Sequence, residues 1–155
     1  MTDRSNRAIG AAEALGLRHA VTRHGPVRSL EEAAEARGLS PRAIIKSLVV
    51  RVDDGDYRFV LVPGDREISW PKLRGLLEVN RLSMPSAEVA LEVTGYVRGT
   101  ITPLGSTTAW PVIADASLQG EVSLGGGAHG VALTVDAAEL VDVLDATVAD
   151  VTERA

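Results

Sequence analysis

The stretch Ile44–Val62, IIKSLVVRVDDGDYRFVLV, decides how this chain folds. Two runs rich in valine, isoleucine, leucine and aromatic residues stand on either side of Asp53–Asp56, a tetrapeptide that contains an Asp-Gly pair. Such residues favour strands, and Asp-Gly between two strand-like runs is a strong signal for a hairpin turn. The sequence therefore predicts antiparallel strands at 44–52 and 57–62, the second of them stopped by Pro63.

Helices are expected on both sides of this hairpin. The sequence SLEE at 29–32 forms a capping box, in which a serine caps the helix and a glutamate lies three residues further on. A second box begins the last helix at Asp136. Apolar residues at helical spacing, bounded by glycine or proline, indicate the others. The expected helices cover 5–16, 29–38, a short turn from Ser40-Pro41, 69–78, 86–93 and the residues after Asp136.

Further strands are expected at 20–22, 111–115, 120–124, 131–135 and 147–151. Short strands that alternate irregularly with hairpins and helices favour an α+β fold over a doubly wound one. A chain of 155 residues is long enough to bury a core of its own. We therefore expect one domain over 1–155, with a mixed, mainly antiparallel sheet.

The composition excludes several classes of function. Without cysteine, neither disulfides nor thiolate metal sites can form. The three histidines lack the HxxH or HxH spacing of a metal site, so no metal and no other cofactor is predicted. No apolar run approaches the ~20 residues that span a membrane, and the N-terminus lacks the apolar block of a signal peptide. We therefore expect no membrane contact and a cytoplasmic location.

Charge is distributed unevenly along the chain. The net charge of -5 argues against a sequence-independent coat for nucleic acid. Residues 1–98, however, hold 15 basic and 13 acidic residues, whereas residues 99–155 hold one arginine and 8 acids. A polyanion could therefore meet the first part and avoid the second, although uneven charge is also common in proteins that bind nothing charged.

The stretch Thr94–Gly105, TGYVRGTITPLG, indicates a binding loop. Three glycines and a proline follow a helical pattern within twelve residues. Glycine lets the backbone approach a ligand closely, and proline fixes the shape of a loop. Such a loop can present its N–H groups to a substrate, which suits a chain that also lacks the Gly-x-Ser-x-Gly motif of serine hydrolases.

Lys46 and His129 are the two side chains that stand out. Strand alternation puts Lys46 on the face of Ile44, Leu48 and Val50, where it either reaches solvent or points into a cleft as a cation for a carbonyl or phosphate oxygen. His129 follows three glycines and precedes another. Its imidazole is either a solvent-facing group in a flexible hairpin or a group that faces a ligand.

Together these motifs resemble one family. Lys46 within IKSL, the TGY tripeptide followed by Gly99-x-x-x-Pro103-Leu104-Gly105, and a glycine-rich turn before a strand and the last helix are similar to the YbaK-type aminoacyl-tRNA deacylases. These proteins are relatives of the editing domain inserted in bacterial prolyl-tRNA synthetases. The resemblance covers nearly the whole chain, and the lysine with the Gly-x-x-x-Pro loop is a fairly specific pair.

The resemblance implies a sheet that curls toward a barrel, surrounded by helices. It also implies an enzyme that, without a metal or a protein nucleophile, hydrolyses the ester between a wrong amino acid and the 3′ end of tRNA, using a positioned water and a ribose hydroxyl. The implied partners are the acceptor end of aminoacyl-tRNA and, for recruitment, prolyl-tRNA synthetase. The implied catalytic residues are Lys46 and Gly99, and the implied substrate-binding residues are Ser47, Thr100, Ile101, Thr102, Pro103, Gly105, Gly126 and His129.

Departures from the family pattern leave the amino acid open. Ser47 stands where members that clear alanine often carry asparagine, and it is closer to the cysteine-clearing type. Thr22 and Ala132 stand where some cysteine-clearing members have tyrosine and aspartate, and Ala128-His129 replaces a basic pair. Cys-tRNA(Pro) is the first expectation, and another small amino acid on tRNA is the second.

Two functions of other classes remain possible. One is a non-catalytic binding module of the same fold, which the missing tyrosine and aspartate favour. The other is an accessory subunit of a synthetase, which predicts stable co-purification and no hydrolysis. Lys46 with the Gly99–Pro103 pair favours catalysis over both.

Overall fold

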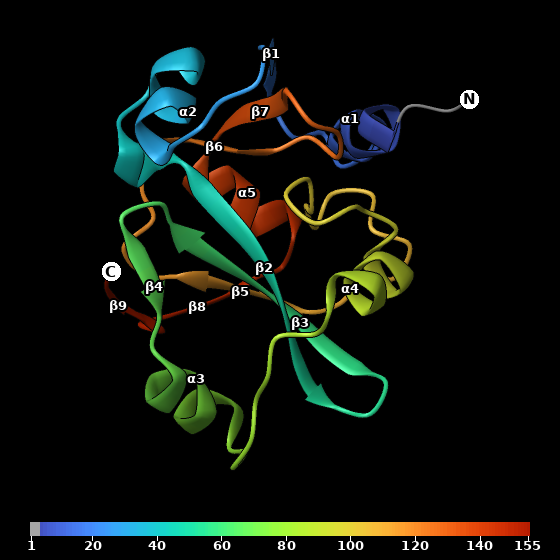
Figure 1. Ribbon diagram of the computed structural model, residues 1–155, viewed down its shortest axis with the longest axis vertical. Coiled ribbons are helices and arrows are strands. Elements are labelled where there is room, and N and C mark those ends of the chain that lie inside the picture. Colours follow the sequence, from blue (N-terminus) through green and yellow to red (C-terminus); the bar gives the residue numbers. More distant parts are fainter. Residues whose placement is uncertain (1–3) are drawn as a thin grey trace.

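The predicted hairpin lies at the centre of the fold (Figure 1). In the computed structural model, which describes residues 4–155, β2 (Ile45–Asp53) pairs antiparallel with β3 (Asp56–Pro63). On its other side β3 runs parallel to β5 (Val112–Asp115), and β5 runs parallel to β8 (Thr147–Ala149). These strands form one sheet in the order β2-β3-β5-β8, with β2 as an outer strand.

The remaining strands form two smaller antiparallel sheets. One has the order β1-β7-β6 and consists of β1 (Ala20–Arg23), β7 (Val131–Asp136) and β6 (Glu121–Gly125). The other pairs β4 (Arg66–Ile68) with β9 (Thr152–Arg154). Antiparallel pairs thus outnumber parallel ones, which confirms the prediction of a mixed, mainly antiparallel α+β fold.

The helices begin where the sequence places caps. Ser29 Oγ accepts a hydrogen bond from the Glu32 N–H at 3.1 Å, and Asp136 Oδ2 accepts one from the Glu139 N–H at 3.1 Å. Both predicted capping residues are therefore confirmed. The helices are α1 (Arg4–Ala14), α2 (Leu30–Arg37), the 3-10 helix η1 (Pro41–Ala43), α3 (Trp70–Leu77), α4 (Ala87–Thr94) and α5 (Ala137–Val143). Within residues 4–155 none of them combines the length and the apolar character that crossing a bilayer requires.

Alternation along β2 separates two apolar clusters. Ile45 and Val49 are buried on one face, in the larger cluster that also includes Phe59. Val50 is buried on the other face, in a cluster that packs against α3 through Leu73. The prediction that successive β2 residues face opposite ways is therefore confirmed, and both faces of this strand are covered.

One predicted element is wrong in extent. The sequence indicated a single last strand at 147–151, but β8 ends at Ala149 and β9 begins at Thr152. Between them Val151 is fully buried, its N–H donates to Asp115 Oδ1 at 3.1 Å, and its carbonyl accepts from the Ser69 N–H at 2.8 Å. These hydrogen bonds fix Val151 at the point where the chain passes from one sheet to the next. The strand that follows, β9, is the only described partner of β4.

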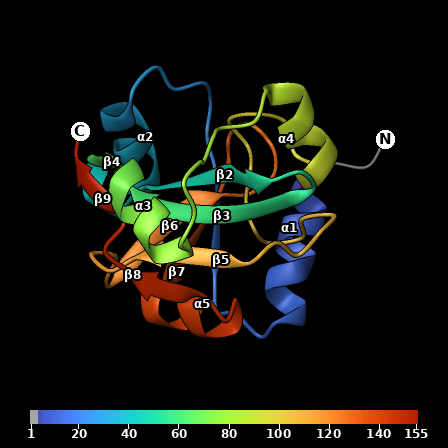
Figure 2. The same ribbon diagram turned by 90° about the horizontal axis from the view of Figure 1, so that it is seen from below.

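The expected curling toward a barrel is unconfirmed. In the described part of the chain the two larger sheets are linked by one isolated bridge between Ile44 and Ser123, and their pairing does not close into a barrel. Figure 2 shows α2 and α4 on the same side of β2, near its opposite ends. The outer edge of β2 therefore lies between two helices.

Candidate functional site

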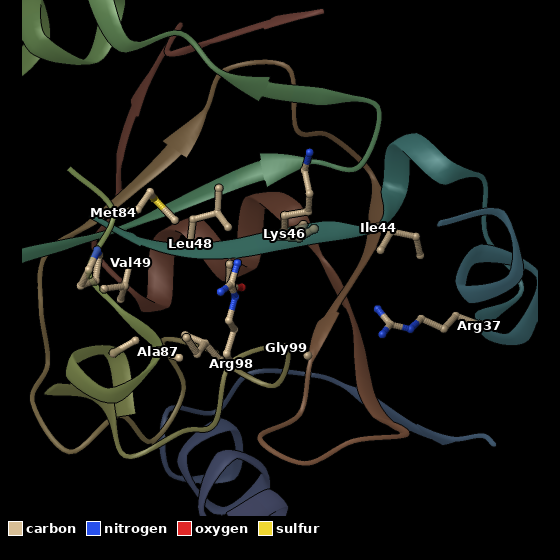
Figure 3. Close-up of a pocket in the computed structure, with 15 residues that line it drawn as sticks. Arg37, Ile44, Lys46, Leu48, Val49, Met84, Ala87, Arg98 and Gly99 are labelled. Atoms are coloured by element: carbon tan, nitrogen blue, oxygen red, sulfur yellow. The ribbon is translucent and has the colours of Figure 1, made fainter. Parts of the chain in front are cut away.

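A cavity of about 610 Å³ follows the outer edge of β2 (Figure 3). On this edge the described part of the chain has two isolated β-bridges. One joins Arg51 of β2 to Ser83, and the other joins Ile44, the residue directly before β2, to Ser123. Between these bridges the strand edge faces the cavity, and side chains from both faces of β2 can reach it. We call this space the edge cavity. Its other walls are the end of α2, the start of α4 and the loop at 98–101.

The glycine-rich loop contributes backbone to this cavity. Gly99 has φ 90°, a conformation that side chains other than glycine rarely adopt, and both Gly99 and Ile101 line the cavity. Thr100 is turned inward, where its N–H and its Oγ1 both donate to the Val97 carbonyl, at 2.9 and 2.6 Å. The N–H groups of Gly99 and Ile101 make no hydrogen bond to another described residue.

The rest of the loop supports this shape. Thr102 is buried, and its Oγ1 accepts from the Leu104 N–H at 3.3 Å. Tyr96 is fully buried and donates its hydroxyl to the Leu104 carbonyl at 2.6 Å. Pro103 is buried, and Gly105 packs against α1. The structure therefore places Thr100, Thr102, Pro103 and Gly105 behind the cavity wall, where they hold Gly99 and Ile101.

His129 lies against Gly99 from the other side. A Cβ built on Gly99 would stand 3.6 Å from His129 Cε1, and the two residues line a second cavity of about 420 Å³. Gly126 is buried nearby and donates its N–H to the Val131 carbonyl at 2.9 Å, so it shapes the turn that carries His129. The predicted glycine-rich turn and the predicted loop thus meet at Gly99.

Lys46 and Ser47 both line the edge cavity, and their side chains lie on opposite faces of β2. Ser47 Oγ is buried and has no hydrogen-bond partner among the described residues. The Lys46 ammonium donates to the Arg66 carbonyl, and Figure 3 shows this side chain extending away from Gly99. The structure therefore brings the backbone of Lys46 to the site while its ammonium is bound on the far side of the strand.

The surroundings of Lys46 shift the pKa of its ammonium downward. Burial lowers the pKa of Lys46, and the carboxylates of Glu67 and Asp65 offset only part of this effect. Both carboxylates belong to the segment around β4. None of the described residues that line the edge cavity is acidic, so a developing negative charge there would meet only backbone donors and cations.

Sequence reasoning missed two arginines at the site. Arg98 extends from the loop toward β2, and Arg37 extends from the end of α2 toward Gly99 (Figure 3). Arg37 looks in the sequence like an ordinary cation in the last turn of a helix, and no local pattern distinguishes it. Arg98 directly precedes Gly99, which was the only available signal. In residues 4–155 no three His, Asp or Glu side chains are grouped as metal ligands would be.

Comparison with known proteins agrees with this fold and identifies the family. The sequence model of the aminoacyl-tRNA editing domain matches residues 24–143, well over half of the chain. The match includes β2, the loop at 98–105 and the turn that carries His129. The chain therefore belongs to the aminoacyl-tRNA editing domain family, as Lys46 and the glycine-rich loop predicted.

Two proline–tRNA ligases are similar to part of the chain. The ligase of Bacillus licheniformis is 33% identical over 107 residues, which make up 68% of this chain and 18% of the ligase. The ligase of Thermosipho africanus is 38% identical over 93 residues, or 60% of this chain and 16% of the ligase. The chain thus spans less than a fifth of the length of either relative.

A solved structure is similar over almost the whole chain. It is the crystal structure of a protein described as a candidate trans-editing enzyme for prolyl tRNA synthetase. Its TM-score is 0.88 at 29% sequence identity, and the match covers 99% of each chain. The fold described above is therefore also found as a chain of this size.

Proposed function

We propose that this chain is a trans-editing hydrolase, which removes a wrong amino acid from the 3′ end of a tRNA. The observation that carries the proposal is the edge cavity, which is lined by β2 and by Gly99 and Ile101, two residues whose N–H groups have no partner among the described residues. Membership of the editing-domain family and the likeness to a free-standing chain support it. Such an enzyme works in the cytoplasm, where aminoacyl-tRNA is made.

In the proposed reaction a water molecule attacks the ester carbon. The new bond joins the water oxygen to that carbon, the bond from the carbon to the ribose oxygen breaks, and a proton from the water ends on the ribose oxygen. The products are the free amino acid and the deacylated tRNA. Negative charge develops on the carbonyl oxygen, and the N–H groups of Gly99 and Ile101 stabilise it without a metal or a protein nucleophile.

Small and apolar residues form part of the wall of the edge cavity. Ala87 and Ala90 of α4 and Ile101 of the loop give it an apolar lining, and Ser47 adds one hydroxyl. We propose Cys-tRNA(Pro) as the substrate, with another small amino acid on tRNA as the alternative. Because one methylene changes discrimination by only about 10–200-fold, the choice needs a direct comparison of substrates.

A non-catalytic binding module is the second candidate. The observation that favours it is the Lys46 ammonium, which is bound to the Arg66 carbonyl on the side of β2 away from Gly99. In that case the edge cavity would hold an aminoacylated end without cleaving it. Recruitment to prolyl-tRNA synthetase is compatible with either candidate.

The deciding experiment is hydrolysis of 3′-labelled Cys-, Ala-, Ser- and Pro-tRNA(Pro) by the wild type, Lys46→Ala and Lys72→Ala. Lys72 is the chain's other lysine; its ammonium pairs with Asp150 at 3.0 Å and does not line the edge cavity. We expect one mischarged tRNA to be hydrolysed by the wild type and, at the same rate, by Lys72→Ala. A loss of about 10²–10³ in kcat for Lys46→Ala would mean that its ammonium leaves the Arg66 carbonyl for the substrate, whereas an unchanged kcat would leave the stabilisation to the N–H groups of Gly99 and Ile101. Hydrolysis of none of the four by folded wild type would reject tRNA(Pro) editing.

A further inference from the structure

The second cavity adjoins the edge cavity. It lies between the segment that follows β1, at 24–27, and the turn at 128–131. Three residues, Arg37, Gly99 and Gly125, line both cavities. A ligand with its ester at Gly99 can therefore extend from one cavity into the other past the Arg37 side chain. We call this second space the Arg37 cavity.

The charge of Arg37 has no acidic counterpart among residues 4–155. Its Nε is buried without a hydrogen-bond partner, and its Nη1 makes one long hydrogen bond, 3.4 Å, to Ser123 Oγ. No carboxylate of the described residues forms an ion pair with it, and burial lowers the pKa of Arg37. A half-buried cation without an acidic partner is unfavourable unless a ligand supplies the negative charge.

His24 adds a hydrogen-bond acceptor to the same cavity. Its Nδ1 lies 2.8 Å from the Gly25 carbonyl oxygen, and this contact requires the proton to be on Nδ1. In the neutral ring Nε2 is then an acceptor, and this atom is buried without a partner. The Arg37 cavity thus offers an unpaired cation and an unpaired acceptor, which match a phosphate and a hydroxyl or amino group of one nucleotide.

We propose that Arg37 binds the 5′ phosphate of the nucleotide that carries the ester, while His24 Nε2 accepts a hydrogen bond from the same nucleotide. The inference rests on the proposed function, because it starts from an ester held at Gly99. It gives this acidic chain a local site for the end of a polyanion. The phosphate contact acts on binding, and the reacting atoms remain at Gly99 and Ile101.

The test compares two small esters of the amino acid found in the tRNA panel. One is adenosine esterified at its 3′ hydroxyl, and the other is the same ester with a 5′ phosphate. We expect Arg37→Gln to raise KM for the phosphorylated ester about 10-fold and to leave its kcat unchanged, because a hydrogen bond to a charged group is lost. KM for the ester without phosphate should not change. Equal effects on both esters, or on neither, would overturn the proposal.

Arg42→Gln is the matched control. Arg42 is exposed in η1, lines neither cavity and carries the same charge. It should leave the KM of both esters unchanged. Arg37→Lys keeps the charge but loses the planar fork, so we expect a partial effect on the phosphorylated ester. An Arg42→Gln effect as large as that of Arg37→Gln would assign the result to overall charge and overturn the proposal.

Two further readouts separate the possible failures. Without ligand, Arg37→Gln should melt at the same temperature as the wild type or higher, because it removes an unpaired half-buried charge; a lower melting temperature would make Arg37 structural. Calorimetric binding of adenosine 5′-monophosphate and of adenosine does not depend on hydrolysis. If Arg37→Gln weakens binding of the monophosphate but not of adenosine, and no tRNA is cleaved, the phosphate site is supported and the deacylase activity is rejected. If tRNA is cleaved but Arg37→Gln binds the monophosphate as tightly as the wild type does, the phosphate site is rejected.

Discussion

Arg7 Nε donates a hydrogen bond of 2.6 Å to the carbonyl of Gly105, although 98 positions separate the two residues. The same guanidinium donates to the Thr94 carbonyl at 3.2 Å and lies 4.5 Å from the centre of the Tyr96 ring. One side chain of α1 therefore binds both ends of the loop that carries Gly99. The position of the proposed oxyanion donors therefore depends on the first helix of the chain, far from them in sequence.

Replacing Arg7 should therefore affect the conformation of the loop more than the stability of the whole fold. We expect Arg7→Ala to lower the free energy of unfolding by about 1–3 kcal/mol, because the partly buried Gly105 carbonyl loses its donor and the Thr94 carbonyl keeps only the Thr107 N–H. We also expect kcat/KM to fall by more than the loss of folded protein would explain, because Arg7 no longer holds the loop that carries Gly99. Urea unfolding and deacylation assays measure the two effects. Arg4→Ala, which removes an exposed arginine from the same helix, is the control and should change neither.

Gly105 should tolerate no side chain. A Cβ at this position would lie 2.6 Å from the Arg7 carbonyl oxygen, and the residue has φ 72°. Gly120 has a similar φ of 67° but open space around it. We expect Gly120→Ala to lose about 1–2 kcal/mol from backbone strain alone and Gly105→Ala to lose clearly more. Equal losses in thermal unfolding would show that the approach of α1 to this loop is loose.

Ser47 is expected to contribute to substrate binding and not to the stability of the fold. Its buried hydroxyl has no partner, so Ser47→Ala should leave the free energy of unfolding unchanged or raise it by up to about 1 kcal/mol. KM for the aminoacylated substrate should rise. Ser69→Ala is the comparison, because Ser69 is also buried but caps α3 by accepting from the Lys72 N–H, and it should lose about 1 kcal/mol. Destabilisation of Ser47→Ala equal to that of Ser69→Ala would contradict this assignment.

Asp115 should make the stability depend on pH. Burial by itself raises its pKa, but hydrogen bonds from Ser117, from the Val151 N–H and from Thr152 outweigh burial, so the pKa of Asp115 lies below its ordinary value. A carboxyl with a lowered pKa stabilises the fold above its unfolded pKa, about 4, and this contribution is lost as pH falls through the folded pKa.

The measurement is the difference in unfolding free energy between the wild type and Asp115→Asn across this pH range. We expect the variant to be less stable by about 1–3 kcal/mol at pH 7, because the amide replaces an acceptor with a donor facing N–H groups. The difference should shrink as pH falls below about 4. Asp142→Asn, at an exposed position on α5, should show no such dependence.

Local signals predicted most of the elements and the family. The caps at Ser29 and Asp136, the hairpin turn at 53–56 and the glycine-rich loop depend on residues close in sequence, and the structure has them where expected. β4 and β9 could not be predicted, because three-residue strands exist only through each other and through Val151. Arg37 escaped notice for the same reason: its significance depends on Gly99, which is far from it in sequence.

The position of β2 also bears on self-association. An outer strand with unpaired backbone is the usual place where one copy of a protein adds to the sheet of another. Here the bridges at Ile44 and Arg51 leave a short stretch open, and α2 and α4 stand near its two ends. A nucleotide end can enter that space, whereas a second extended chain would have to displace both bridges. The exposed backbone that the binding site needs is thereby kept from acting as a template for aggregation.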